Sequence, residues 1–146
     1  MNSHLTPATP SEINYQSLNF TEKFGLIHEQ WAPKTIAEMN DYQFKLVKLQ
    51  GDFIWHDHVD TDETFIVMEG QLRIDFRDGQ VLVSQGEMFV VPKGVEHKTF
   101  AENEVKLLLI EPRGVLNTGH VSAQTPTHCL VLFDICPQGG EVITYH

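Results

Sequence analysis

Hydrophobic and polar residues alternate along most of the chain after Pro33, and this period of two predicts β-strands. The first two runs, 35–39 and 42–50, flank Asn40-Asp41, a dipeptide typical of a two-residue hairpin turn. Further strands are predicted at 53–58, 63–69, 71–77, 80–83, 87–91, 96–101, 104–111 and 129–135. Many short strands, separated by Gly-, Pro- or Asn-containing turns, indicate an all-β sandwich or barrel.

The rest of the chain shows weaker patterns. Residues 1–20 are predicted to be a flexible N-terminal segment, and 22–30 are compatible with a turn or a short helix. No long amphipathic pattern follows Pro33, which excludes a sheet built from alternating strands and helices. Residues 114–127 are predicted to form a loop that crosses the barrel before the last strand, and 21–146 to form one domain.

The composition narrows the class of protein. The chain has 146 residues, of which 41% are hydrophobic and 21% charged, as in a globular domain. A formal net charge of −10 disfavours binding to nucleic acids or anionic lipids. There is no apolar run of membrane-spanning length and no signal-peptide pattern, so we expect a cytoplasmic protein without a membrane partner. Cys129 and Cys136 are interpreted as reduced, structural thiols.

A group of potential metal ligands lies in the middle of the chain. His56 and His58 are two residues apart, so in a strand both side chains point to the same face. Residues 59–62 can reverse the chain, which places Glu63 at the start of the next strand beside the two histidines. His97 follows a Pro92-Lys93-Gly94 turn and begins a later strand.

These four residues, His56, His58, Glu63 and His97, are predicted to hold one divalent transition-metal ion, with Fe, Mn, Zn and Ni as the candidates. A single histidine on a strand is more often a surface or hydrogen-bonded core residue, so the prediction depends on all four together. The other five histidines are interpreted as ordinary residues.

The same alternation predicts a pocket beside the ion. Its lining residues are expected to be Ile54, Phe65, Val67 and Thr99. Further candidates for its wall are Ile74, Phe76, Met88, Val90, Leu107 and Leu109. Asp57 and Glu96 are expected to face outward.

The two segments around the histidines resemble the two motifs of the cupin superfamily. The first family motif has Gly, five residues, His-x-His, three or four residues, Glu, six residues and Gly, and the chain matches it from His56 to Gly70, with Gly51 one residue closer to His56. The second has Gly, five residues, Pro-x-Gly, two residues, His, three residues and Asn. The chain matches it from Gly86 to His97, with Ala101 in place of Asn.

This resemblance covers about residues 35–112, with core motifs at 51–70 and 86–101. It is closest to small single-domain bacterial cupins, and it implies a jelly-roll β-barrel of six to eight strands after a short irregular N-terminal segment. It also implies a metal site, and usually a homodimer that exchanges or pairs N-terminal strands. We place the dimer interface at about 35–50.

Three functions remain open from the sequence. The first is a metal-dependent enzyme, dioxygenase- or isomerase-like, that acts on a small organic acid, enol or phenol. The second is a non-enzymatic module that binds a small ligand or a metal. The third is a sugar-phosphate isomerase, which would need cations to bind phosphate. Arg73, Arg77, Lys93 and Lys98 are the candidates for that role, and acidic neighbours flank them.

Overall fold

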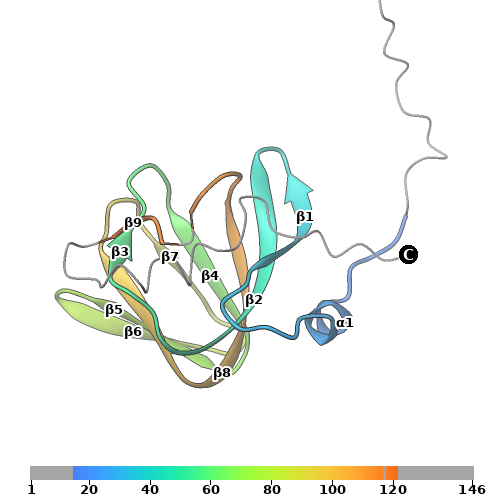
Figure 1. Cartoon of the computed structure of the whole chain (residues 1–146), viewed down its shortest axis with the longest axis horizontal. Helices are drawn as coiled ribbons and strands as arrows, with labels where there is room; N and C mark the ends of the chain where they lie inside the picture. Colours follow the sequence, from blue (N-terminus) through green and yellow to red (C-terminus); the bar gives the residue numbers. More distant parts are fainter. Residues whose placement is uncertain (1–14, 117, 122–146) are drawn as a thin grey trace, which may run out of the picture.

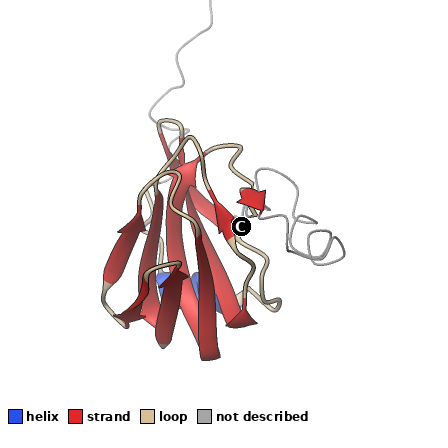
Figure 2. Cartoon of the chain, turned by 90° about the vertical axis from the view of Figure 1, so that its left-hand side faces the viewer, coloured by secondary structure: helices blue, strands red, loops and turns tan. Residues whose placement is uncertain are grey.

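The computed structural model describes residues 15–116 and 118–121, and antiparallel strands make up most of them (Figures 1 and 2). In chain order the elements are α1 (Phe20–Gly25), β1 (Lys34–Met39), β2 (Tyr42–Asp52), β3 (His56–Asp57), β4 (Glu63–Glu69), β5 (Gln71–Phe76), β6 (Gly79–Ser84), β7 (Met88–Val91), β8 (His97–Pro112) and β9 (His120–Val121). The predicted all-β jelly-roll barrel is confirmed.

The long strand β8 joins the two halves of the barrel. It pairs with β2 along most of its length, with β5 over residues 97–100 and with β4 over residues 106–110. The sequence predicted two strands here, 96–101 and 104–111, and that prediction is wrong. Leu49 pairs with Val105 and Gly51 with Ala101, so β8 has extra residues at this point. Such a bulge bends a strand without ending it.

The N-terminal hairpin forms as predicted. β1 and β2 pair in antiparallel fashion, and Asn40 takes a φ of 55°, a left-handed conformation that asparagine tolerates better than most residues. Before the hairpin, α1 begins after Asn19, whose side chain accepts a hydrogen bond from the Glu22 backbone N–H at 3.0 Å. The short helix is thus present, although it starts earlier than the 22–30 region that the sequence suggested.

Two apolar clusters hold these elements together. The interior of the barrel is filled mainly by Val47, Leu49, Phe65, Val67, Leu72, Ile74, Val83, Val91, Ala101, Val105, Leu107 and Leu109. A second cluster joins the helical segment to the outer face of β1, β2 and β8 through Phe24, Ile27, Ile36, Leu46 and Leu108. Alternate residues of β2 and β8 therefore contribute to opposite sides of one sheet, as the period of two requires.

Several predicted details differ from the structure. Strand 53–58 is reduced to His56–Asp57, and the predicted crossing loop contains the short strand β9, which pairs with β3. The predicted strand 129–135 and both cysteines lie outside the described residues. Within 15–116 and 118–121, no helix has the length and apolar character that crossing a bilayer requires.

Candidate metal centre

The four predicted ligands come together at one end of the barrel. The ligand atoms of His56, His58, Glu63 and His97 all lie within 4.8 Å of one another, and all four residues are buried. Glu63 Oε2 is 3.0 Å from His97 Nε2 and 3.1 Å from His58 Nε2. The rings of His56 and His97 are 4.4 Å apart between centroids. The structure therefore brings into one place two segments that are distant in the sequence, residues 56–63 and the segment that carries His97.

Hydrogen bonds tie the loops of the two ligand segments together. The backbone N–H of Gly94 donates to the His58 carbonyl at 2.7 Å, and the backbone N–H of Lys93 donates to Asp62 Oδ1 at 2.9 Å. The Pro-x-Gly turn is thus anchored on the loop that connects β3 to β4. As a result, the position of His97 is coupled to that of His58.

Two of the histidines are oriented by the backbone. Nδ1 of His56 lies 2.9 Å from the Ile54 carbonyl oxygen, and Nδ1 of His97 lies 2.8 Å from the Val95 carbonyl oxygen. A carbonyl oxygen only accepts hydrogen bonds, so each Nδ1 carries the proton. In the neutral ring, Nε2 is then left with a free lone pair, which is the form that binds a metal.

Burial and mutual charge set the protonation of the cluster. Burial lowers the pKa of His56 to about 4, so this ring stays neutral over most of the pH range. Burial by itself would raise the pKa of Glu63, but the adjacent His58 and His97 hold it well below its usual range. Burial would likewise lower the pKa of His58, and the Glu63 carboxylate outweighs it and raises the value. At neutral pH the site therefore offers a carboxylate and at least one neutral imidazole.

The donor set fits a divalent transition metal. His58 Nε2 is buried and makes no hydrogen bond of acceptable geometry, even though Glu63 Oε2 is close to it. A buried polar atom without a partner is costly, and a cation between these atoms would satisfy it. Three imidazoles and one carboxylate suit Zn, Fe, Mn or Ni better than Ca or Mg.

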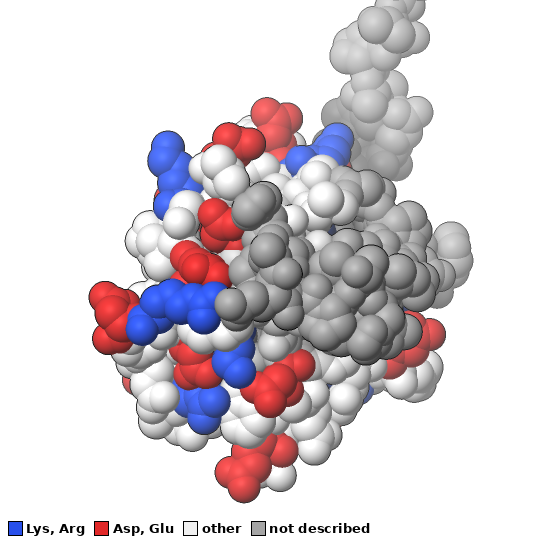
Figure 3. Space-filling view, turned by 60° about the vertical axis from the view of Figure 1, so that its left-hand side comes forward, with Lys and Arg blue, Asp and Glu red and all other residues white. Residues whose placement is uncertain are grey.

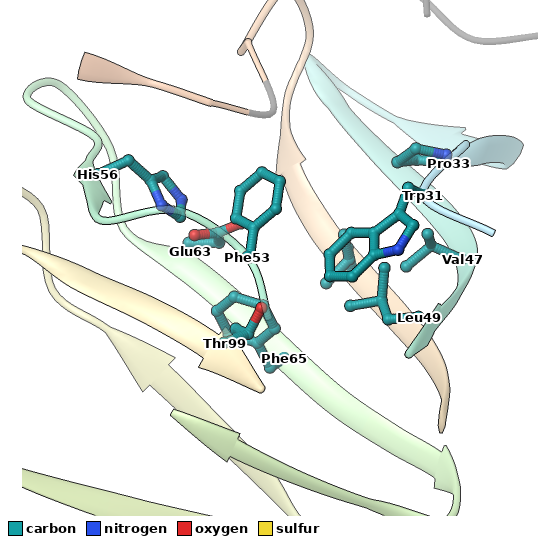
Figure 4. A pocket seen from close by; sticks show the side chains of 10 residues that line it. Trp31, Pro33, Val47, Leu49, Phe53, His56, Glu63, Phe65 and Thr99 are labelled. Carbon is teal, nitrogen blue, oxygen red and sulfur yellow. The ribbon is translucent and has the colours of Figure 1, made fainter. Parts of the chain in front are cut away.

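A small apolar cavity of about 50 Å³ adjoins the ligands (Figure 4). It is lined by Trp31, Pro33, Val47, Leu49, Phe53, His56, Glu63, Phe65, Thr99 and Leu109. The Phe53 ring stacks on Trp31, with 5.2 Å between centroids, and meets His56 edge-on at 5.0 Å. Phe53 thus connects the ligand cluster to the opposite wall of the cavity.

The structure places only some of the predicted pocket residues around this cavity. Phe65, Thr99 and Leu109 line the cavity, whereas Ile54 and Val67 do not. Because residues 53–55 do not form a strand, the alternation counted back from His56 fails, and Phe53 lines the cavity instead of Ile54. Val67 lies within the apolar core.

Most of the further residues predicted to form the cavity wall do not line the cavity. Ile74 and Leu107 are in the core, and Phe76 packs against it. Met88 and Val90 are 56% and 42% exposed, because β7 has the parity opposite to the predicted one and turns Phe89 and Val91 inward.

Other residues near the site were missed by the sequence analysis. Trp31 and Pro33 precede the first strand, where no alternation exists to place them. Lys45 and Glu111 form a buried ion pair at 2.9 Å. The alternation along the two strands could have predicted that both side chains face inward. Lys45 has the same parity as Val47 and Leu49, which face inward, and Glu111 has the same parity as Leu109.

The outer surface next to the site carries ion pairs. Glu96 pairs with Arg77, in accord with its expected outward orientation. Arg73 pairs with Asp75 at 2.7 Å and Lys98 with Asp52 at 3.1 Å. Figure 3 shows Lys and Arg interspersed with Asp and Glu on the face that it draws. The described residues visible on that face therefore form no continuous basic patch of the kind that binds a phosphate backbone.

The barrel and its buried His and Glu cluster define a small β-barrel protein with a candidate metal site. The family model described as "Cupin domain" matches residues 45–111, and the chain belongs to this family. It is 60% identical to a cupin-2 domain containing protein of Shewanella frigidimarina NCIMB 400, with a TM-score of 0.65 and coverage of 66% of this chain and 94% of that one.

Two further proteins resemble the chain, one in sequence and one in fold. The chain is 40% identical over 74 residues to the uncharacterized protein YdbB of Bacillus subtilis (strain 168), and the match covers 50% of this chain and 66% of that protein. The structure of the hydroquinone 1,2-dioxygenase PnpCD in complex with Cd²⁺ and 4-hydroxybenzonitrile has a TM-score of 0.54 at 16% identity, over 63% of this chain and 70% of that one. The latter similarity concerns the fold alone.

Proposed function

We propose that this cupin is a metal-dependent enzyme that acts on a small organic acid, enol or phenol. His56, His58, Glu63 and His97 would hold one Fe, Mn, Zn or Ni ion. The observation that supports this proposal most directly is the convergence of four buried ligand atoms, within 4.8 Å of one another, beside a cavity that His56 and Glu63 help to line. A ligand in the cavity would therefore lie against the metal ligands.

The ion would supply Lewis-acid or redox chemistry when bound. The chain's own residues determine what reaches it. Glu63 Oε2 lies between His58 Nε2 and His97 Nε2, so the role we assign to Glu63 is that of a ligand rather than a general base. The aromatic rings of Trp31, Phe53 and Phe65 exclude water from the opposite side and strengthen any charged contact made inside.

The cavity lining favours a substrate with one polar end and an apolar body. Apart from His56 and Glu63, the hydroxyl of Thr99 and the indole N–H of Trp31 are the hydrogen-bonding side-chain groups among the lining residues of this cavity. No Lys or Arg belongs to this lining, which argues against the sugar-phosphate alternative. Its volume of about 50 Å³ is well below the roughly 150 Å³ of a cavity that admits benzene. A substrate with a ring therefore requires Trp31 or Phe53 to move aside.

Phenols are a reasonable first class of compound to test. The hydroquinone dioxygenase that shares the fold was crystallised with a phenol, 4-hydroxybenzonitrile. The apolar walls of the present cavity suit such a compound, as they suit an enol or a short-chain acid. The alternative of a non-enzymatic binding module predicts that the same compounds bind without being converted.

We further propose a homodimer with an interface at 35–50, and a cytoplasmic location. β1 supports the dimer proposal, because it pairs with β2 alone among the described strands and is therefore a sheet edge.

The test begins with elemental analysis of the protein purified without added metal. We expect close to one equivalent of Fe, Mn, Zn or Ni, and near-complete loss in the variant His56→Ala/His97→Ala. The metal-loaded protein is then incubated with phenols, enols and short organic acids, with and without O₂, and the products are identified by mass spectrometry. Metal-free wild-type protein, or equal metal content in the double variant, would refute the metal site. Binding without conversion across the panel would support the non-enzymatic alternative.

A further inference from the structure

Residues 118–121, here called the strap, lie outside the segment that matches the family model and pack against the metal-ligand strand. Within the strap, β9 pairs with β3 in antiparallel register, with Val121 opposite His56 and His120 opposite Asp57. Thr118 is buried, and the backbone N–H of Gly119 donates to the Leu116 carbonyl at 3.0 Å. The chain therefore returns, after β8, to cover the free side of the strand that carries His56.

Gly119 is the point of closest approach. A Cβ atom at this position would overlap the Asp57 carbonyl oxygen and would lie 2.8 Å from His58 Nδ1 and 3.0 Å from His58 Cε1. Its φ is 49°, which also favours glycine. By contrast, Gly86 has a φ of 81° but nothing within 4 Å of its own hypothetical Cβ. Glycine at 119 therefore meets a steric requirement of the site as well as a conformational one.

The ring against which Gly119 packs needs such support more than its neighbours do. His56 and His97 are each oriented by a carbonyl two residues earlier in the chain. His58 follows the end of β3, so its backbone is held by the hydrogen bond that its carbonyl accepts from the Gly94 N–H rather than by the strand ladder, and no such bond orients its ring. Its Nε2 edge faces Glu63 Oε2 at 3.1 Å, and Gly119 lies by its Nδ1 edge.

We propose that the strap holds the His58 ring in its metal-binding orientation and that Gly119 is the positioning residue. This inference rests on the proposed metal site. It extends that site beyond the four ligands to a segment outside the family match. Groups that orient a metal-bound histidine without touching the ion typically affect metal affinity by about 10- to 100-fold.

The first experiment compares Gly119→Ala with Gly86→Ala in the full-length protein. Zn²⁺ affinity is measured by competition with a chromophoric chelator, after circular dichroism and thermal melting have shown that both variants are folded. We expect Gly119→Ala to weaken Zn²⁺ binding about 10- to 100-fold. Gly86→Ala introduces the same methyl group at positive φ without touching the site, so its affinity should match wild type. Equal affinity in wild type and Gly119→Ala would overturn the inference.

A double-mutant cycle tests whether Gly119 acts through His58. If it does, Gly119→Ala should have little further effect on Zn²⁺ affinity once His58 is replaced by Ala. Purely additive losses would show that Gly119 acts elsewhere and would overturn the positioning role. If wild type binds no Zn²⁺ at all, the proposed metal site itself has failed, which this experiment distinguishes from failure of the strap.

If Gly119→Ala does not fold, hydrogen exchange of the wild-type protein with and without Zn²⁺ still tests the inference. Coupling between two sites is reciprocal, so if the strap favours metal binding, the metal must stabilise the strap. We expect Zn²⁺ to slow backbone hydrogen exchange at 119–121, and to leave exchange at the Gly86 turn unchanged. Unchanged exchange at 119–121 under saturating Zn²⁺ would overturn the inference.

Discussion

His56 and His97 are register partners across β3 and β8, and both rings are oriented in the same way, each Nδ1 donating to a carbonyl two residues earlier. Because the two bonds are local, each ring keeps its orientation without help from distant parts of the chain. Both Nε2 atoms are then available to one ion. This arrangement explains why replacing either residue should affect metal binding more than folding.

Replacing His97 should remove the metal but leave the fold. His97→Ala deletes one buried ligand, while the apolar core that stabilises the barrel is untouched. We expect metal content to fall to background, and the loss of buried contacts to cost about 1–2 kcal/mol, or roughly 2–8 °C in melting temperature. His28→Ala is the matched control, because His28 is exposed and should change neither quantity. An unfolded His97→Ala protein would show that the metal, rather than the core, provides most of the stability.

Metal occupancy should fall as the pH decreases, and His58 and His56 should contribute to this fall at different pH values because their pKa values differ. Protons compete with the metal for the ligands. The pKa of His58 is raised above 6.5, so in the metal-free protein His58 takes up the first proton as the pH falls. His56, with a pKa of about 4, remains neutral until much lower pH. We therefore expect occupancy to fall first through protonation of His58.

The measurement is metal content after dialysis at a series of pH values and two free-metal concentrations. The midpoint should shift to lower pH when free metal is higher, because bound metal suppresses protonation. A midpoint that is the same at both concentrations would contradict the assignment of these histidines as ligands.

In the metal-free protein, His56 should make the fold less stable as the pH decreases. Its pKa is about 4 in the folded state, against an ordinary value of 6.5 in the unfolded chain, so the unfolded chain binds more protons between these values. The contribution of His56 to the free energy of unfolding therefore decreases as the pH falls through this window. His58 acts in the opposite direction, because its raised pKa favours the folded state once it is protonated. Urea denaturation of His56→Gln and wild type at pH 7 and pH 5 measures the effect. Between these two pH values, the free energy of unfolding should decrease less in the variant than in wild type.

The two tryptophans should report cavity occupancy differently. Trp31 lines the cavity, whereas Trp55 lies against Arg77, whose guanidinium carbon is 3.9 Å from the centre of the indole ring. In Trp55→Phe, the remaining fluorescence comes from Trp31, and titration with catechol should change its intensity or emission maximum. In Trp31→Phe, the same titration should give no saturable change. A saturable response from Trp55 alone would place the bound molecule outside the cavity.

Breaking the buried ion pair should destabilise the barrel more than removing it altogether. Lys45→Met leaves the Glu111 carboxylate buried without its cation, a change that typically costs about 3–5 kcal/mol. Burial and the nearby Glu63 already raise the pKa of Glu111, so this carboxyl should take up a proton in the variant. The double variant Lys45→Met/Glu111→Leu replaces both charges by apolar groups and should recover most of the loss. Urea denaturation measures all three proteins, and a double variant less stable than Lys45→Met would contradict this account.

Light scattering should give the mass of a dimer at micromolar concentration. Met39 and Tyr42, at the tip of the β1–β2 hairpin, are 55% and 45% exposed, and they are register partners beside the open edge that β1 forms. Met39→Lys/Tyr42→Lys should weaken an interface at 35–50 and yield monomer. Leu82→Lys, on an exposed side chain of β6, is the control and should leave the dimer intact. A monomeric wild-type protein would exclude the proposed interface.

The sequence by itself determined the fold class and the group of candidate ligands. Alternation of apolar and polar residues is a local property, and it placed most strands within one or two residues of their observed bounds. The ligand group was equally accessible, because His56, His58 and Glu63 belong to one short hairpin-like segment and His97 follows a recognisable turn. Local geometry thus sufficed to predict that these side chains would face one space.

Only the tertiary structure decided what surrounds those ligands. The Lys45–Glu111 pair joins residues 66 positions apart, and Trp31 meets Phe53 across a segment without strand periodicity. The prediction of inward-facing residues from strand alternation failed at Ile54 because the chain leaves the strand conformation at 53–55. It also failed at β7, where pairing with β4 determines which residues turn inward. The strap is positioned by its pairing with β3, and the position of Gly119 is distinguished by the close approach of the Asp57 carbonyl and the His58 ring. Such contacts depend on how distant segments pack, a relation that no local pattern of residues contains.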